Sequence, residues 1–351
     1  MNKTTFVKAI NQAIEIAMEI DPKVLCYGLG ATDPKGIFGS TLGLEEKFGR
    51  ERVFDMPTSE NAMTGVGIGL SMAGFKPIMT HQRLDFFLLA MDQLVNGAAK
   101  MHYMFDGAVS VPITIRLILG RGWGQGPTHS QNLQAWFAHI PGLKVVMPSN
   151  AYDAKGLLLS SIFDPDPVIF LEHRWLHNSL GEVPLNDYRI TLGKANKITK
   201  GINLTLVSMS YMTVEALMAQ KYLKKYDISL DLIDLRTVKP IDFEAIVESL
   251  EVTRKILILD TGVSTCSIAS EIISYIAINH SSLLDKPPEK ITMPDIPEPT
   301  SYGLTKNFYP RAADIAQKII SIIGIEGINP YEEIKKPSPH DVPGEWFKGP
   351  F

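Results

Sequence analysis

Short apolar segments alternate with longer amphipathic ones, and this alternation constrains the fold of the chain most strongly. In the first half, we predict strands at 24–27, 52–55, 77–80, 112–117, 144–148 and 168–171. We predict helices at 4–20, after residue 60, at 86–103 and at 151–163. Strands that are apolar on both faces and alternate with helices indicate a mostly parallel sheet covered on both sides.

A second unit of the same kind follows a polar, turn-rich segment. Its strands are predicted at 203–207, 229–234 and 255–260, and its helices at 213–226, 242–250, 266–280 and 310–323. We therefore predict an α/β protein with two domains, 1–185 and 203–328, joined by a linker at 186–202. The proline-rich tail, 329–351, is expected to lie along a surface or a partner without regular structure.

The composition excludes several classes of protein. The chain has 351 residues and a formal net charge of −4, so it lacks the basic excess that binding to nucleic acid requires. Its two cysteines support neither a disulfide framework nor a cysteine metal site. No apolar run is long enough to cross a membrane, and the first residues do not form a signal peptide. We expect a cytoplasmic protein.

Glu60 is the most informative single residue. It is the only acid between Asp55 and Asp85, and a run of small and apolar residues follows it. A charge that enters a closely packed helix needs a partner, although an acid in the first turn is also stabilised by the helix dipole. Glu60 is therefore either a helix-terminal acid or a functional group. Because ligands bind at the carboxyl ends of parallel strands, the segments 28–30, 56–60, 80–86 and 120–131 are expected to meet at one site.

Six runs of sequence carry a resemblance to a known family. They are Phe54 to Glu60, Asp85 to Lys100, His129 to Gln131, Pro141 to Val146, Asp153 to Leu158 and Ile233 to Asp242. In this order and spacing, the chain resembles the β subunit of the thiamine-diphosphate-dependent decarboxylase of 2-oxoacid dehydrogenase complexes, of the pyruvate and branched-chain types. The resemblance implies a transketolase-like pyrimidine-binding domain followed by a transketolase C-terminal-like domain.

The resemblance also implies an active site. Glu60 is expected to bind and activate the aminopyrimidine ring of thiamine diphosphate, with Phe86 packed on this ring and Gln82 lining the pocket. His129 is expected to act in catalysis, in substrate binding or in transfer to a lipoyl group. The alternatives are a core position for Phe86 and a structural role for His129.

A structural potassium site is implied as well. The resemblance places it mostly on main-chain carbonyls around a turn at 161–166, opposite a strand. The expected residues are Ile113, Ser161, Ile162, Asp164 and Asp166. The alternative is a helix-to-strand turn that Asp164 and Asp166 stabilise without an ion.

The sequence lacks one half of such a site. No Gly-Asp-Gly followed by an Asn-Asn pair occurs, and this segment holds the magnesium and the diphosphate in thiamine-diphosphate enzymes. A separate α subunit is therefore expected to supply that half in an α₂β₂ tetramer. A lipoyl acyltransferase is a further expected partner, and a small 2-oxoacid is the expected substrate.

Three positions depart from the family pattern. Leu29 and Thr80 stand where the family usually has acids, and Arg83 stands where it usually has an aromatic residue. We therefore hypothesise that Arg83 or Arg121 meets an anionic group on an unusual substrate. The alternative for both is a surface arginine.

Two other functions remain open. One is a split transketolase-like subunit that transfers two-carbon ketol units, which would share the fold and the glutamate. The other is a non-catalytic assembly subunit whose second domain docks an acyltransferase. The presence of Glu60, Phe86 and His129 favours an enzyme.

Overall fold

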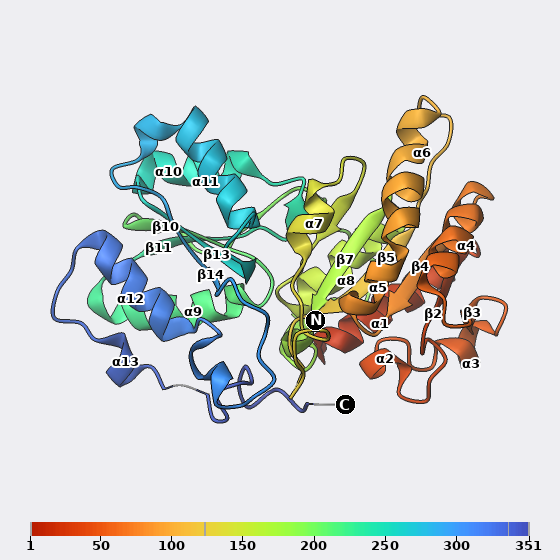
Figure 1. Cartoon of the computed structure of the whole chain (residues 1–351), viewed down its shortest axis with the longest axis horizontal. Helices are drawn as coiled ribbons and strands as arrows, with labels where there is room; N and C mark the ends of the chain where they lie inside the picture. The colour runs from red at the N-terminus through yellow and green to blue at the C-terminus, as the bar shows by residue number, and fades with distance from the viewer. Residues whose placement is uncertain (1, 123, 336, 350–351) are drawn as a thin grey trace.

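Two α/β units lie side by side in the computed structural model of the chain, which describes residues 2–122, 124–335 and 337–349 (Figure 1). The first contains a seven-stranded sheet. Its strands, in sheet order, are β12 (Thr237–Lys239), β6 (Lys144–Val146), β7 (Val168–His173), β5 (Thr114–Leu119), β4 (Lys76–His81), β2 (Val24–Gly28) and β3 (Val53–Asp55). All pairs are parallel except β12 with β6, so the predicted fold class is confirmed.

Both faces of this sheet are buried, because consecutive strand residues belong to different cores. Cys26 packs on one face with α1 (Phe6–Ile20) and α8 (Ala151–Ile162), and Tyr27 packs on the other. The second face is covered by α4 (Glu60–Met72), α5 (Leu84–Phe87) and α7 (Gln134–His139). The remaining elements before the second unit are α2 (Gly36–Gly39), α3 (Leu44–Phe48), α6 (Ala99–Met104) and a separate antiparallel pair, β1 (Asn2–Thr5) with β8 (Leu180–Val183).

The helix predicted at 86–103 is not continuous. After α5 the chain forms a 3₁₀ turn (Leu88–Ala90), a π-helical segment (Gln93–Ala98) and then α6. Gly97 lies in the π-helical segment, and a side chain there would approach Ile68 Cδ1 of α4 to 2.9 Å. The segment thus packs closely against α4 where the helix type changes. The apolar periodicity of the sequence alone does not reveal this change of helix type.

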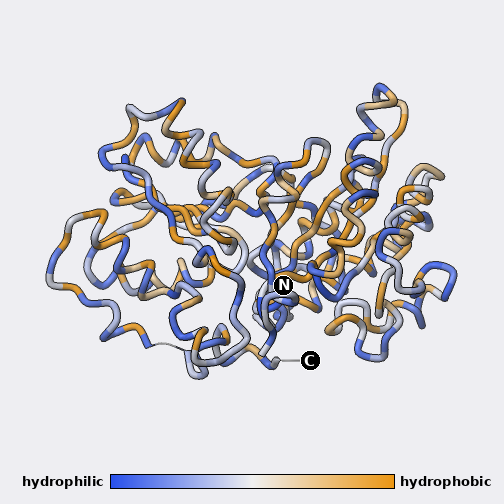
Figure 2. Tube along the Cα trace, in the orientation of Figure 1, coloured by the Kyte–Doolittle hydropathy of each residue, from blue (hydrophilic) through white to orange (hydrophobic). Residues whose placement is uncertain are grey.

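The second unit has a five-stranded sheet between two pairs of helices. The strand order is β14 (Glu289–Met293), β13 (Ile256–Val263), β10 (Leu204–Ser208), β11 (Leu230–Asp234) and β9 (Asn196–Lys197), with only β9 antiparallel. Helices α9 (Met212–Leu223) and α12 (Ala312–Ile323) cover one face, and α10 (Phe243–Thr253) and α11 (Ile268–Asn279) cover the other (Figure 1). The three central strands, β13, β10 and β11, are hydrophobic along most of their length (Figure 2).

Several short elements were not predicted, and three of them lie in segments expected to be irregular. Strand β9 forms inside the expected linker, and β14 forms inside a proline-rich stretch. The tail contains the short helix α13 (Pro330–Glu333), so the prediction of a tail without regular structure is wrong there. In the described ranges, no helix combines the length and the apolar character that crossing a bilayer requires.

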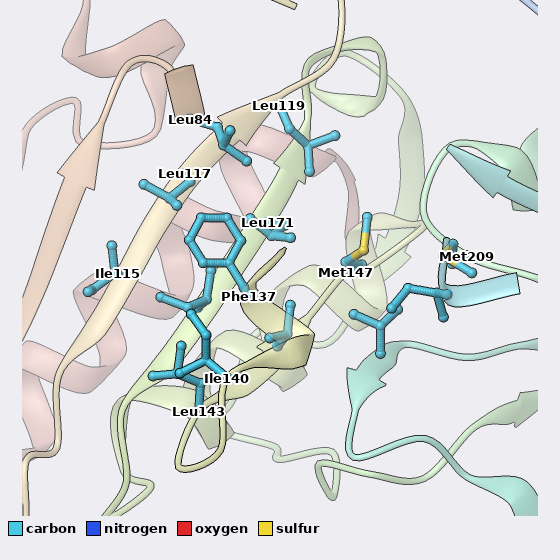
Figure 3. Close-up of a cluster of buried hydrophobic side chains, with 14 of the residues drawn as sticks. Leu84, Ile115, Leu117, Leu119, Phe137, Ile140, Leu143, Met147, Leu171 and Met209 are labelled. Carbon is cyan, nitrogen blue, oxygen red and sulfur yellow. The ribbon is translucent and has the colours of Figure 1, made fainter. Parts of the chain in front are cut away.

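The two units share a core. Strand β12 follows the second unit's β11 in the chain but pairs with β6 of the first sheet. One cluster of buried side chains runs from Phe137 and Leu171 through Met147 to Met209 of the second unit (Figure 3). This shared core fixes the second unit relative to the edge of the first sheet at which the loops converge.

Candidate active site

A cavity of about 580 Å³ opens at the carboxyl ends of β2, β3 and β4. Each of these strands leads into a segment that lines it. The lining residues are Leu29, Gly30, Asp33, Asp55, Met56, Thr58, Glu60, Gln82 and Phe86. The structure therefore brings together Glu60, Gln82 and Phe86, which are distant in sequence, at the edge where parallel sheets bind ligands.

Glu60 is the first residue of α4, and its side chain is 8% exposed. Thr64 Oγ1 donates a hydrogen bond to the main-chain oxygen of Glu60 at 2.9 Å, and not to its carboxylate. Among the described residues, this carboxylate has neither a hydrogen-bond donor nor a cation as partner. The helix N-terminus stabilises its charge, and its acceptor capacity remains available to a molecule in the cavity.

The loop after β2 is held tightly against Gln82 and Asp55. Gly30 has a φ of +77°, and a Cβ added to it would lie 2.7 Å from Gln82 Nε2. Asp55 Oδ1 accepts from the Ala31 amide at 2.7 Å, and Asp55 Oδ2 accepts from Thr32 Oγ1 at 2.8 Å. Asp55 ends β3 inside one of the matched runs, but its residue type and position predict no role in the site.

Phe86 and His129 contact each other edge to face, with ring centroids 5.3 Å apart and planes at 87°. Phe86 is half-buried at the cavity, whereas its neighbour Phe87 is fully buried and occupies the core position. His129 is exposed, and its Nδ1 lies 3.0 Å from Thr128 Oγ1. Four of the expected site residues thus lie together. Glu60, Gln82 and Phe86 line the cavity, and His129 contacts the ring of Phe86.

Asp85 holds the segment that follows His129. Its Oδ1 accepts from Gln131 Nε2 at 2.8 Å and from the Gln131 amide at 3.4 Å. Asp85 also lies in a matched run without an assigned role, so only the structure identifies it as a support for the loop.

Arg83 and Arg121 are both buried, so the alternative of surface arginines is wrong. Arg83 donates to the Gly120 oxygen at 2.9 Å and to the Gln125 side chain, and burial lowers its pKa to about 10. Arg121 donates to the Gln125 oxygen at 2.7 Å and pairs with Asp341 at 3.0 Å. A substrate anion would have to displace these protein acceptors before it could bind either arginine. The sequence did not predict these acceptors.

The other two departures from the family pattern, Leu29 and Thr80, place no acid where the family usually has one. Leu29 lines the cavity, and the hydroxyl of Thr80 donates to the Tyr27 oxygen at 3.3 Å. His81 is buried, and burial lowers its pKa to about 4, so its ring is neutral. On the neighbouring strands, Arg116 and Glu172 form a buried ion pair at 2.6 Å.

The residues expected to hold potassium lie elsewhere, at the turn between α8 and β7. Lys144 Nζ lies 2.6 Å from Asp164 Oδ1 and 3.1 Å from Asp166 Oδ2, so one ammonium group already pairs with both carboxylates. The Ile113 oxygen accepts from the Val168 amide at 3.0 Å, which places the strand carbonyl beside this turn. Of the residues expected to bind potassium, this leaves the main-chain carbonyl oxygens of 113, 161 and 162 as oxygen ligands that suit a cation.

Comparison with known proteins gives the family of each unit. The family model described as transketolase, pyrimidine binding domain, matches residues 2–178, and that described as transketolase, C-terminal domain, matches residues 193–315. A solved structure titled split gene transketolase, inactive beta4 tetramer, has the same fold, with a TM-score of 0.75 and 20% identity. The superposition covers 92% of this chain and 99% of that one.

Relatives of higher identity span most of the chain. The 2-oxoisovalerate dehydrogenase subunit beta of Bacillus subtilis is 41% identical over 298 residues, covering 85% of this chain and 91% of the relative. The acetoin:2,6-dichlorophenolindophenol oxidoreductase subunit beta of the same organism is 39% identical, with 92% and 97% covered. Pyruvate dehydrogenase E1 component subunit beta-1, mitochondrial, of Arabidopsis thaliana is 37% identical, with 88% and 86% covered. The chain therefore belongs to the family of β subunits of thiamine-diphosphate-dependent 2-oxoacid and acetoin dehydrogenases, which carry the transketolase pyrimidine-binding and C-terminal domains.

Proposed function

We propose that the chain is the β subunit of an α₂β₂ enzyme that oxidatively decarboxylates a small 2-oxoacid and transfers the acyl group. The observation that carries this proposal is Glu60, a residue only 8% exposed whose carboxylate lines a cavity and has no partner among the described residues. A ligand in the cavity that donates a hydrogen bond would therefore meet a free acceptor.

The lining of the cavity fits the aminopyrimidine ring of thiamine diphosphate. Glu60 would accept a hydrogen bond from a ring nitrogen, Phe86 would pack on the ring, and Gln82 offers an amide at the rim. When bound, thiamine diphosphate supplies the carbon nucleophile that attacks the ketone carbonyl of the substrate. The part of this chain is to orient the ring and to hold the proton at its nitrogen.

His129 is proposed to serve the substrate side of the same site. Its ring lies against Phe86 and is exposed, so it can reach a substrate or a lipoyl group that approaches from outside. An imidazole at this place can donate or accept a hydrogen bond. Neither Arg83 nor Arg121 is assigned to the substrate, since both guanidinium groups are engaged by the protein.

The magnesium and diphosphate half of the site is proposed to come from an α subunit. The relatives are named as β subunits, and the sequence lacks the Gly-Asp-Gly and Asn-Asn segment. Docking of a lipoyl acyltransferase belongs to the same proposal.

We also propose that the carbonyl oxygens of residues 113, 161 and 162 hold a potassium ion. We expect the unfolding temperature of the chain to be higher in KCl than in NaCl at equal ionic strength, and equal temperatures would exclude the ion.

The test is a substrate screen with the reconstituted enzyme. The chain is purified with an α chain that bears the diphosphate motif, and turnover of pyruvate, branched-chain 2-oxoacids and acetoin is measured with an artificial electron acceptor. We expect turnover of a 2-oxoacid by the complex and none by the β chain alone. Transfer of ketol units between sugars, without 2-oxoacid turnover, would favour the split transketolase instead.

Acetoin cleavage is the second candidate function. The acetoin oxidoreductase β subunit of Bacillus subtilis matches over 92% of this chain, nearly as closely in identity as the 2-oxoisovalerate relative. Acetoin has no carboxylate, and the cavity lining offers no cationic side chain to bind one. Acetoin as the best substrate in the screen would establish this function.

A further inference from the structure

We propose that Asp341 and Arg121 are positioning residues through which the C-terminal tail fixes the loop that carries His129. We call residues 337–349 the strap and residues 124–131 the His129 loop. The proposal rests on the proposed role of His129 for its effect on catalysis, but the mechanical link between strap and loop does not depend on that role.

The strap connects the two units. At one end, Arg311 Nη2 of the second unit donates to the main-chain oxygens of His340 and Val342, both at 3.0 Å. Further along, Trp346 Nε1 donates to the main-chain oxygen of Trp175 in the first unit at 3.0 Å. The strap therefore runs along the junction of the two units, where the blue end of the chain passes in Figure 1.

Arg121 joins the strap to the His129 loop. Its Nη1 donates to the Gln125 oxygen in the loop at 2.7 Å and to the Pro299 oxygen at 2.7 Å, and its Nη2 lies 3.0 Å from Asp341 Oδ2. Arg121 and Asp341 are only 1% and 4% exposed. Among the described residues, Asp341 is the only acid in an ion pair with Arg121, so it alone compensates this buried charge directly.

The His129 loop has two further contacts, one at Gly126 and one at Gln131. Gly126 lies so close to Thr300 that no side chain could be added without displacing the threonine. At its end, Gln131 donates to Asp85 on α5. His129 lies between these two attachments with its ring against Phe86, so release of either one would change where the imidazole lies relative to the cavity. A shift of about 1 Å at such a group is enough to slow catalysis.

The test compares two carboxylate-to-amide changes in the same tail region. Asp341→Asn removes the charge that faces Arg121 with almost no change in shape. The matched control is Glu333→Gln, because Glu333 accepts from Tyr222 at 3.0 Å far from the loop. In the complex with the α chain, amide hydrogen exchange of peptide 124–131 and the kcat and KM for the best substrate are measured for each variant.

We expect Asp341→Asn to raise exchange in the His129 loop about tenfold and to lower kcat while KM changes little. Asp341→Glu should restore part of the kcat, and Glu333→Gln should change neither measurement. Arg121→Lys, which keeps the charge but loses the forked geometry, should loosen the loop in the same way if Asp341→Asn does not fold.

Equal loop exchange in wild type, Asp341→Asn and Arg121→Lys would overturn the proposal. Retained activity of His129→Ala would contradict the role of His129 instead, and it would leave the exchange measurement as the test of the strap. The two failures are therefore distinguishable.

Discussion

The unusual polar residues of this chain differ in whether their side chains have partners within the protein. Glu60 is buried at a cavity and has no partner in the described part of the chain, which suits a group that awaits a ligand. Arg83 and Arg121 are equally unusual in the sequence, yet their guanidinium groups donate to carbonyl and carboxylate oxygens of the protein. Residue type and position predicted that Glu60 lies at a pocket, but they did not predict that protein acceptors bind the two arginines.

Glu298 provides a pH test at the same scale. Its Oε2 is shielded from solvent and has no hydrogen-bond partner in the described residues, and burial raises its pKa to about 8, against the opposing influence of Arg121. Between the ordinary pKa of 4.5 and the raised pKa of about 8, Glu298 keeps its proton in the folded chain and loses it in the unfolded chain. The free energy of unfolding should therefore fall as the pH rises from 4.5 to about 8.

Glu298→Gln should remove this dependence. We expect its unfolding free energy to exceed that of wild type by about 4 kcal/mol at pH 8, and by no more than about 1 kcal/mol near pH 5. Thermal unfolding of both chains between these pH values is the measurement. A wild-type chain that becomes more stable over this interval, with an unchanged difference from the variant, would contradict the assignment.

At the scale of elements, α4 positions Glu60 by packing closely on the sheet. A Cβ added at Gly67 would lie 2.6 Å from Ile113 Cδ1 and would collide with the Tyr27 hydroxyl, whereas one added at Gly69 would meet nothing within 4 Å. Gly67→Ala should therefore cost about 1–3 kcal/mol through overpacking. Gly69→Ala should raise stability by about 0.5–1 kcal/mol, because alanine favours the helix.

Urea unfolding of the two glycine variants and wild type tests this packing. Because the first variant displaces α4 from the sheet, it should also lower the activity of the reconstituted enzyme. A loss of stability for Gly69→Ala equal to that for Gly67→Ala would show that helix packing does not distinguish the two positions.

The elements that the sequence predicted are those whose apolar pattern is local. The parallel strands and α1 follow from such patterns. The family resemblance predicted that Glu60, Gln82 and Phe86 lie at one pocket, and all three line the same cavity. Strand β12 was not predicted, because its pairing with β6 depends on a contact between the two units. The pair of Arg121 and Asp341 spans 220 positions, and no local pattern encodes a contact at that distance.

At the scale of the whole molecule, the chain resembles half of an enzyme. Its cavity has a carboxylate and an aromatic ring that we propose for one end of the cofactor, and the sequence lacks the segment that would hold the other end. The shared core and the strap make the two units one support for this half-site. Activity is therefore expected to belong to the complex and to disappear when Glu60 loses its charge.

The most direct measurement is the kcat of the complex with Glu60→Gln, beside wild type and the exposed control Glu182→Gln. The amide keeps the shape of the side chain but cannot hold the proton as the carboxylate does. We predict that all three chains bind the α subunit, that Glu182→Gln keeps wild-type kcat, and that Glu60→Gln loses about 10²–10⁴-fold. A Glu60→Gln complex with wild-type kcat would contradict the central role of this carboxylate.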